Sequence, residues 1–151
     1  MFSNGDTMGD PIERKETTNY AKKNINTFLK KQEYISALLL VWIYVDIRLR
    51  TLLTDFIEPQ NSRWNETSEI LGKISTKELI ILCFKKYKLI LKDQNKVLHQ
   101  LNEKRNKVAH ESSLWRTVPQ DDQVEIEGLC KSAIQFLEDT TITTNNQKRS
   151  A

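Results

Sequence analysis

Residues that break helices and form tight turns are scarce in this chain. Only four glycines and three prolines occur among 151 residues, and two of the glycines lie within the first nine positions. Hairpins between β-strands need glycine, asparagine or aspartate at defined turn positions, so this composition offers little material for building them. The scarcity of breakers therefore favours long helices joined by few connections.

Apolar residues recur at helical spacing along most of the chain. The strongest pattern is one apolar stripe that contains Ile35, Leu38, Leu39, Trp42, Leu49 and Leu53. The predicted helices cover approximately residues 12–31, 33–56, 75–87, 92–109 and 121–139. Because the connections between them are short, we predict an all-α fold, an antiparallel bundle of four to five helices.

The sequence also indicates where the chain is disordered and where two of the helices begin or end. Residues 1–15 and 141–151 are polar and aperiodic, so we expect two disordered segments around one helical domain at 16–140. Pro59 is expected to end the second helix, because a proline ring disfavours a helical conformation in the residue before it. Ser75, with Glu78 three positions later, predicts the cap of the third helix.

The second predicted helix is apolar nearly all round between residues 37 and 45. A helix in a bundle needs only one apolar face, so a second face has two readings. Either the helix is fully central in the bundle, or its second face forms a dimer interface. The sequence alone leaves both readings open.

Several classes of protein are disfavoured by composition. No apolar leader opens the chain and no apolar run reaches the roughly 20 residues of a membrane span, so we expect a cytoplasmic protein without membrane contact. Cys83 and Cys130 stand far apart and are expected to be buried, reduced thiols. With two histidines, two cysteines and no phosphate-binding glycine loop, we predict neither a metal site nor a cofactor.

Positive charge is concentrated in one part of the sequence. Residues 73–107 contain ten basic side chains and three acidic ones, although the whole chain carries a formal charge of only +3. A basic segment of this kind suits a polyanion as partner. A solvated lysine surface that keeps the protein soluble explains the same pattern equally well.

Two charged residues interrupt apolar stripes. Arg105 follows Leu98 and Leu101 at a position where the fourth helix calls for an apolar side chain, and Asp46 does so in the second helix. Half-buried charges are costly unless they are paired, so a contact between Asp46 and Arg105 would account for both. The alternative is an arginine that extends to solvent and an unrelated aspartate at a helix periphery.

Polar groups gather near the end of the fourth helix. Asn106 and His110 are four residues apart and so share a face, with Arg105 about 100° round the helix from Asn106. An imidazole, an amide and a guanidinium together can handle protons and phosphate. A histidine at this place can also simply cap the carboxyl end of the helix.

The segment LHQLNEKRNKVAHE, residues 98–111, resembles the signature helix of the HEPN superfamily. In that helix an arginine, usually followed by asparagine or another polar residue, precedes a histidine by about five positions, as Arg105 precedes His110. The similarity is best over residues 77–111. It implies a small helical bundle that dimerises, here through the apolar second helix and the motif helix. Many members are metal-independent endoribonucleases that act as toxins or anti-phage effectors.

The resemblance assigns roles to individual residues. It implies catalysis by Arg105, His110 and Asn106, with cleavage of RNA through its own 2′-hydroxyl to leave 2′,3′-cyclic phosphate ends. Asp46 is expected to support Arg105. Contacts to the RNA backbone are assigned to lysines on the motif helix, namely Lys92, Lys96, Lys104 and Lys107.

Other HEPN members bind without catalysis, and this keeps competing hypotheses in place. The chain is either the ribonuclease or a non-catalytic dimeric module that binds RNA, a nucleotide or a protein. A regulatory bundle that dimerises through its second helix is a third hypothesis. An antitoxin or a regulatory protein is a further partner that the resemblance implies. Trp115, just after the motif, is expected either to fill a gap in the core or to stack on a base.

Overall fold

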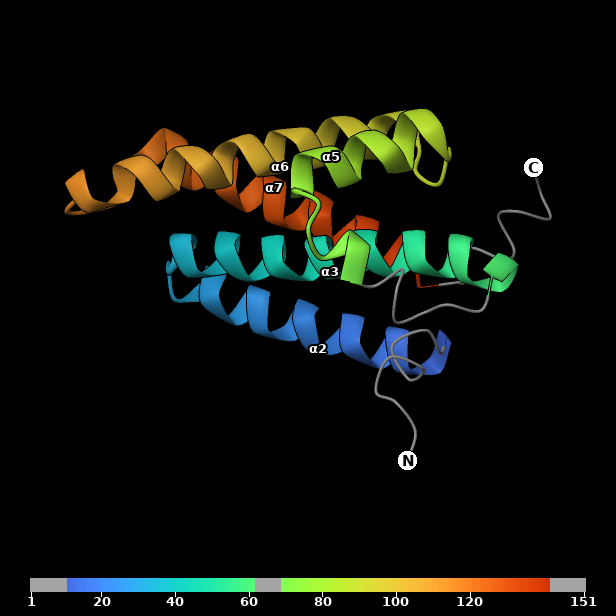
Figure 1. The fold of residues 1–151 in the computed structure, drawn as a ribbon. Helices are drawn as coiled ribbons and strands as arrows, with labels where there is room; N and C mark the ends of the chain where they lie inside the picture. Colours follow the sequence, from blue (N-terminus) through green and yellow to red (C-terminus); the bar gives the residue numbers. More distant parts are fainter. Residues whose placement is uncertain (1–10, 62–68, 142–151) are drawn as a thin grey trace.

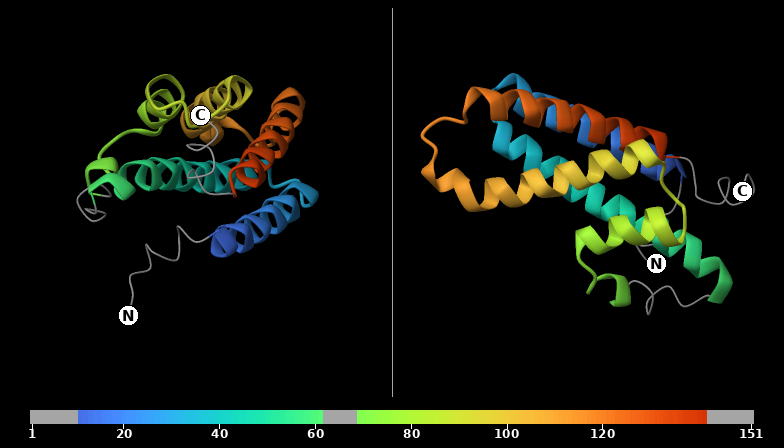
Figure 2. Two further views of the ribbon diagram at one scale, coloured as in Figure 1. Left: turned by 90° about the vertical axis from the view of Figure 1, so that its right-hand side faces the viewer. Right: turned by 90° about the horizontal axis from the view of Figure 1, so that it is seen from above.

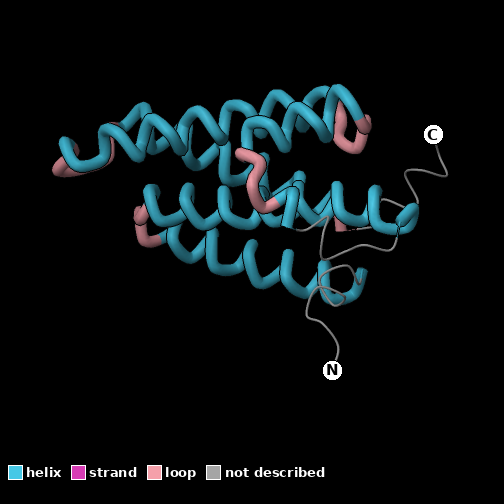
Figure 3. Tube along the Cα trace, viewed as in Figure 1, coloured by secondary structure: helices cyan, strands magenta, loops and turns pink. Residues whose placement is uncertain are grey.

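The computed structural model describes residues 11–61 and 69–141, and their regular structure is entirely helical. The expected all-α helical bundle is confirmed (Figure 3). The long helices are α2 (Pro11–Lys30), α3 (Tyr34–Asn61), α6 (Lys92–Glu111) and α7 (Gln120–Asp139). The shorter elements are α5 (Thr76–Ile81), the π-helix η1 (Leu82–Lys86) and the 3-10 helix η2 (Ser112–Leu114). Of the two segments expected to be disordered, residues 1–10 and 142–151 lie outside the described residues, while residues 11–15 belong to α2.

Helix α3 continues past the point where the sequence predicts its end. It reaches Asn61, so Pro59 lies inside its last turn, and the expected stop at Pro59 is wrong. Proline removes one backbone donor and crowds the preceding turn. At the end of a helix few hydrogen bonds remain to be lost, so the last turn can still form.

The third predicted helix begins as expected and then changes its winding. Ser75 is the N-cap of α5, and its hydroxyl accepts a hydrogen bond from the backbone N–H of Glu78, 3.2 Å away. After Ile81 the chain continues as the π-helix η1. The segment ends where Lys88 takes a positive φ of 53° and Leu89 donates its N–H to the Cys83 carbonyl at 2.6 Å.

Helix α3 is the central element of the bundle. Helix α2 runs along one side of it, and α5 and α6 lie on the other side (Figure 1). Helix α7 packs against α2, α3 and α6, so it closes the bundle from the side (Figure 2). The helix that carries the candidate motif therefore packs against α3, α5 and α7.

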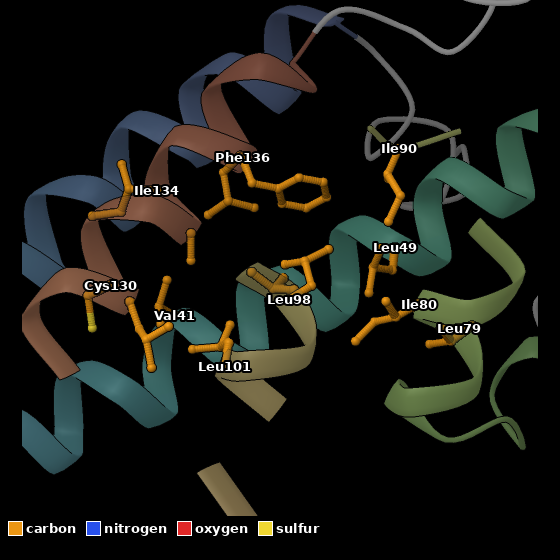
Figure 4. Close-up of a cluster of buried hydrophobic side chains, with 14 of the residues drawn as sticks. Val41, Leu49, Leu79, Ile80, Ile90, Leu98, Leu101, Cys130, Ile134 and Phe136 are labelled. Carbon is orange, nitrogen blue, oxygen red and sulfur yellow. The ribbon is translucent and has the colours of Figure 1, made fainter. Parts of the chain in front are cut away.

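The core lies between α3 and the helices around it (Figure 4). Val41 and Leu49 of α3 meet Leu98 and Leu101 of α6 there, together with side chains of α5 and α7. Cys83 and Cys130 are buried free thiols, and burial raises the pKa of each to about 12. They are therefore poor nucleophiles at neutral pH.

The apolar second face of α3 is not covered by the other residues that the structure describes. Leu39, Ile43 and Ile47 are 38%, 46% and 38% exposed, whereas the apolar residues of the core-facing side, such as Val41 and Val45, are buried. Spaced by four, the three side chains form one stripe along the helix. The helix is thus central in the bundle and still presents one apolar stripe to solvent.

Candidate functional site

Helix α6 carries the arginine, asparagine and histidine of the motif in its last two turns. His110 and Asn106 are exposed, whereas Arg105 is half-buried. The helix begins at Lys92 and ends at Glu111, so His110 lies in its last turn. Leu98, Leu101 and Val108 lie in the core on the side of the helix that faces away from His110, and Arg105 lies along that same apolar side.

Arg105 lies against an aromatic ring of the central helix. Its guanidinium carbon is 4.3 Å from the centre of the Trp42 ring. A cation at this distance is attracted by the π-electrons of the indole, and more strongly when water is partly excluded. The Trp42 Nε1–H donates to the Asn102 Oδ1 at 3.3 Å, and Asn102 is buried on α6. The ring is thus held between two residues of the motif helix.

The guanidinium makes one hydrogen bond beyond this contact. Its Nη1 donates to the Asn106 Oδ1 at 3.2 Å. Its Nε is buried and has no acceptor among the residues that the structure describes. Since the ring occupies one face of the guanidinium and Nε is buried, an oxyanion would have to bind the N–H groups of Nη1 and Nη2 that the bond to Asn106 leaves unused. Arginine binds phosphate oxygens through this edge.

Asp46 does not contact Arg105, so the expected pairing of these two residues is wrong. The Asp46 carboxylate instead accepts hydrogen bonds from Arg50, at 2.8 and 3.2 Å, and from the Thr76 hydroxyl at 2.7 Å. Arg50 is four residues away on the same helix and therefore reaches Asp46 whatever the packing of α6.

The Asp46–Arg50 pair has a structural role. Arg50 also donates to the carbonyl oxygens of Leu71 and Ile74, the latter at 3.0 Å. Together with the Thr76 hydroxyl, these bonds fasten the start of α5 to α3. Asp46 is thus a structural residue in this arrangement rather than a support for Arg105.

Lys104 is buried and already paired, which conflicts with its expected contact to the RNA backbone. It is 5% exposed and binds Asp122 and Glu125 in the first turns of α7, the latter at 2.7 Å. Burial alone would lower its pKa, but the two carboxylates outweigh burial and raise the pKa above its ordinary value. Lys104 therefore holds α7 against α6.

The other three lysines assigned to RNA remain accessible. Lys92, Lys96 and Lys107 are exposed on α6. Lys107 also lines an open groove between α6 and α7, together with Val124 and Leu129. Trp115 is half-buried and packs against the core, which fits its reading as a residue that fills a gap.

Trp42 is the site residue that sequence reasoning missed. It lies within the apolar stripe of α3, where an indole looks like an ordinary core residue. One signal was available, because Arg105 interrupts its own stripe and needs a partner. An aromatic ring serves that purpose as well as a carboxylate does.

Comparison of the chain with models of known protein families, with characterised proteins and with solved structures found no match. Among the described helices, none combines the length and the apolar character needed to cross a membrane.

Replacement of Lys104 by methionine tests its structural role. Lys104→Met leaves Asp122 and Glu125 without their buried partner, so we expect the free energy of unfolding to fall by about 1–3 kcal/mol. The matched control, Lys107→Met, changes an exposed lysine of the same helix and should stay within about 0.5 kcal/mol of wild type. Urea denaturation followed by circular dichroism measures both.

The pH dependence gives the same test a second readout. Because the folded pKa of Lys104 lies above its unfolded value, the stabilising contribution is present at neutral pH and is lost at alkaline pH, as the folded amine deprotonates. Equal stability of the two variants at neutral pH would contradict the structural role.

Proposed function

We propose that this chain is a metal-independent endoribonuclease of the HEPN type, a toxin or an anti-phage defence effector. The observation that carries the proposal is the arginine of the motif. The Arg105 guanidinium carbon lies 4.3 Å from the centre of the Trp42 ring, five residues before an exposed histidine on the same helix. A guanidinium fixed by one face and open at its edge is suited to holding a phosphate.

The proposed reaction requires few groups beyond these. RNA supplies its own nucleophile, so an enzyme must remove the 2′-hydroxyl proton, stabilise the crowded phosphate and protonate the leaving 5′-oxygen. His110 is accessible, and a histidine side chain can carry out proton transfer. Arg105 would offset the charge that develops on the phosphate. Asn106, bonded to Arg105, would keep the guanidinium edge in place.

The helical geometry supports a site made from two copies of the chain. Arg105 and His110 are five residues apart and therefore point about 140° away from each other around α6. A second copy could place its own histidine near the arginine of the first. The exposed stripe of Leu39, Ile43 and Ile47 supports such a dimer, because Leu39 lies within one turn of Trp42.

The accessible lysines support contact with RNA. Lys92 and Lys96 are four residues apart, and helical spacing continues from them through His99 and Glu103 toward His110. Lys107 lies beside this row. Contacts of lysines with phosphates add affinity without reading sequence, so we expect binding that weakens as salt is raised.

A non-catalytic dimeric module, binding RNA, a nucleotide or a protein such as an antitoxin, is the second candidate. One observation favours it, namely that no described residue makes a hydrogen bond to the imidazole of His110. A catalytic histidine is commonly oriented by such a partner. RNA or a second copy of the chain would have to supply it.

The proposal predicts cleavage of RNA without metal ions. Purified protein is incubated with labelled RNA in EDTA, and we expect products that end in 2′,3′-cyclic phosphate. Loss of a proton-transfer group should slow His110→Ala by about 10²- to 10⁴-fold. Loss of the phosphate contact should slow Arg105→Ala by about 10²- to 10³-fold. Gel electrophoresis of the products measures these rates.

His99→Ala is the matched control, since it removes the other histidine of the same helix and should keep the wild-type rate. Undiminished cleavage by both motif variants would exclude the site. Absence of cleavage by wild type, together with salt-sensitive RNA binding, would favour the non-catalytic module.

The dimer has its own test. Ile43→Glu places a charge in the centre of the exposed stripe of α3, so it should convert a wild-type dimer into a monomer and abolish cleavage. Val124→Glu changes an apolar residue of α7 that is more exposed than Ile43, and it should leave the dimer intact. Light scattering after size-exclusion chromatography measures the mass. A monomeric wild type that cleaves RNA would contradict the composite site.

A further inference from the structure

A small pocket lies on the α2 side of the bundle, away from the Trp42–Arg105 contact. Residues of α2, α3 and the end of α7 line it, among them Arg14, Tyr44, Arg48, Thr51 and Leu137. Its volume is about 20 Å³. A cavity needs about 10–15 Å³ to hold one water molecule, so this pocket has room for one particle of that size.

Two buried arginines contribute to the lining. Arg14 is 3% exposed and Arg48 is 6% exposed, so both guanidiniums are almost completely removed from solvent. Arg14 forms an ion pair with Asp55 at 2.5 Å. Two buried groups of like charge beside one pocket repel each other, and burial strengthens that repulsion.

Arg48 is held by neutral oxygen atoms. Its Nη1 donates to the Leu137 carbonyl at 2.7 Å and to the Thr140 hydroxyl at 2.8 Å. Its Nη2 donates to the Thr18 hydroxyl at 2.8 Å. None of these acceptors carries a full negative charge. A guanidinium has five N–H donors, so about two of them remain for another acceptor.

The charged form of Arg48 is disfavoured in these surroundings. Burial, and next to it the nearby charge of Arg14, lower the pKa of Arg48 to about 9, although Asp55 acts in the opposite direction. A negative charge in the pocket would relieve both effects. Thr17 and Tyr44 also line the pocket, and their hydroxyls donate to no described acceptor.

We propose that this pocket binds a small inorganic anion of about the size of chloride. The two guanidiniums supply positive charge, and the free N–H groups of Arg48 and the hydroxyls supply donors. The volume selects a single-atom ion over larger anions such as gluconate. Because the pocket joins α2, α3 and the end of α7, the bound ion would stabilise the packing of α2 on the bundle.

The first experiment compares anions at a fixed sodium concentration. The full chain is melted in sodium gluconate, which is progressively replaced by sodium chloride, and unfolding is followed by circular dichroism. A ligand that binds only the folded state raises Tm until its site is saturated. We expect a rise of about 2–6 °C. Equal Tm values in both salts would overturn the proposal.

A variant separates the pocket from a general salt effect. Thr51→Glu puts a tethered carboxylate at the pocket, three residues after Arg48 on α3. It should raise Tm in gluconate and remove the response to chloride. Thr27→Glu is the matched control, since Thr27 and Thr51 both donate to the carbonyl four residues earlier, at 2.9 Å. Thr27 lies outside the pocket, so this variant should respond to chloride as wild type does.

Arg48→Gln should also lose the response of Tm to chloride. If Arg48→Gln does not fold, the response of Thr51→Glu tests the anion site instead. Anomalous diffraction from a crystal soaked in bromide locates the ion directly, with a peak expected between Arg14 and Arg48. An unchanged chloride response in Thr51→Glu, or no bromide in the pocket, would refute the assignment.

Discussion

The packing of α3 on three sides fixes the position of every other long helix. Helices α2, α6 and α7 all lie against it, and so does the shorter α5. Its charged residues hold these neighbours in place. Arg48 binds the end of α7, and the Asp46–Arg50 pair fastens the start of α5. The side of α3 that presents the apolar stripe is covered by none of the described helices.

The candidate site depends on the same packing. Arg105 belongs to α6, but the ring that holds it belongs to α3. On another side of α6, buried Lys104 fixes the first turns of α7. The motif helix is thus fastened in two directions, which leaves Asn106 and His110 exposed on a rigid support. A site needs such a rigid support if it is to hold a phosphate in one geometry.

Local signals predicted the helices well, while partners between helices were harder to predict. The apolar spacing of α3 and the serine cap of α5 depend on nearby residues, so they could be read directly. The partner of Asp46 could not be predicted in this way, because Arg50 on the same helix and Arg105 on α6 were both able to pair with its carboxylate. The burial of Lys104 could not be predicted from the sequence either, because it depends on where α7 packs against α6.

The contact between Trp42 and Arg105 is the central claim of this account, and the rate of RNA cleavage in EDTA tests it most directly. Trp42→Phe keeps an aromatic face, so it should retain most of the wild-type rate. Trp42→Leu removes that face, so its rate should fall by about 10- to 100-fold while its circular dichroism spectrum stays helical. A folded Trp42→Leu variant that cleaves RNA at the wild-type rate would contradict the account.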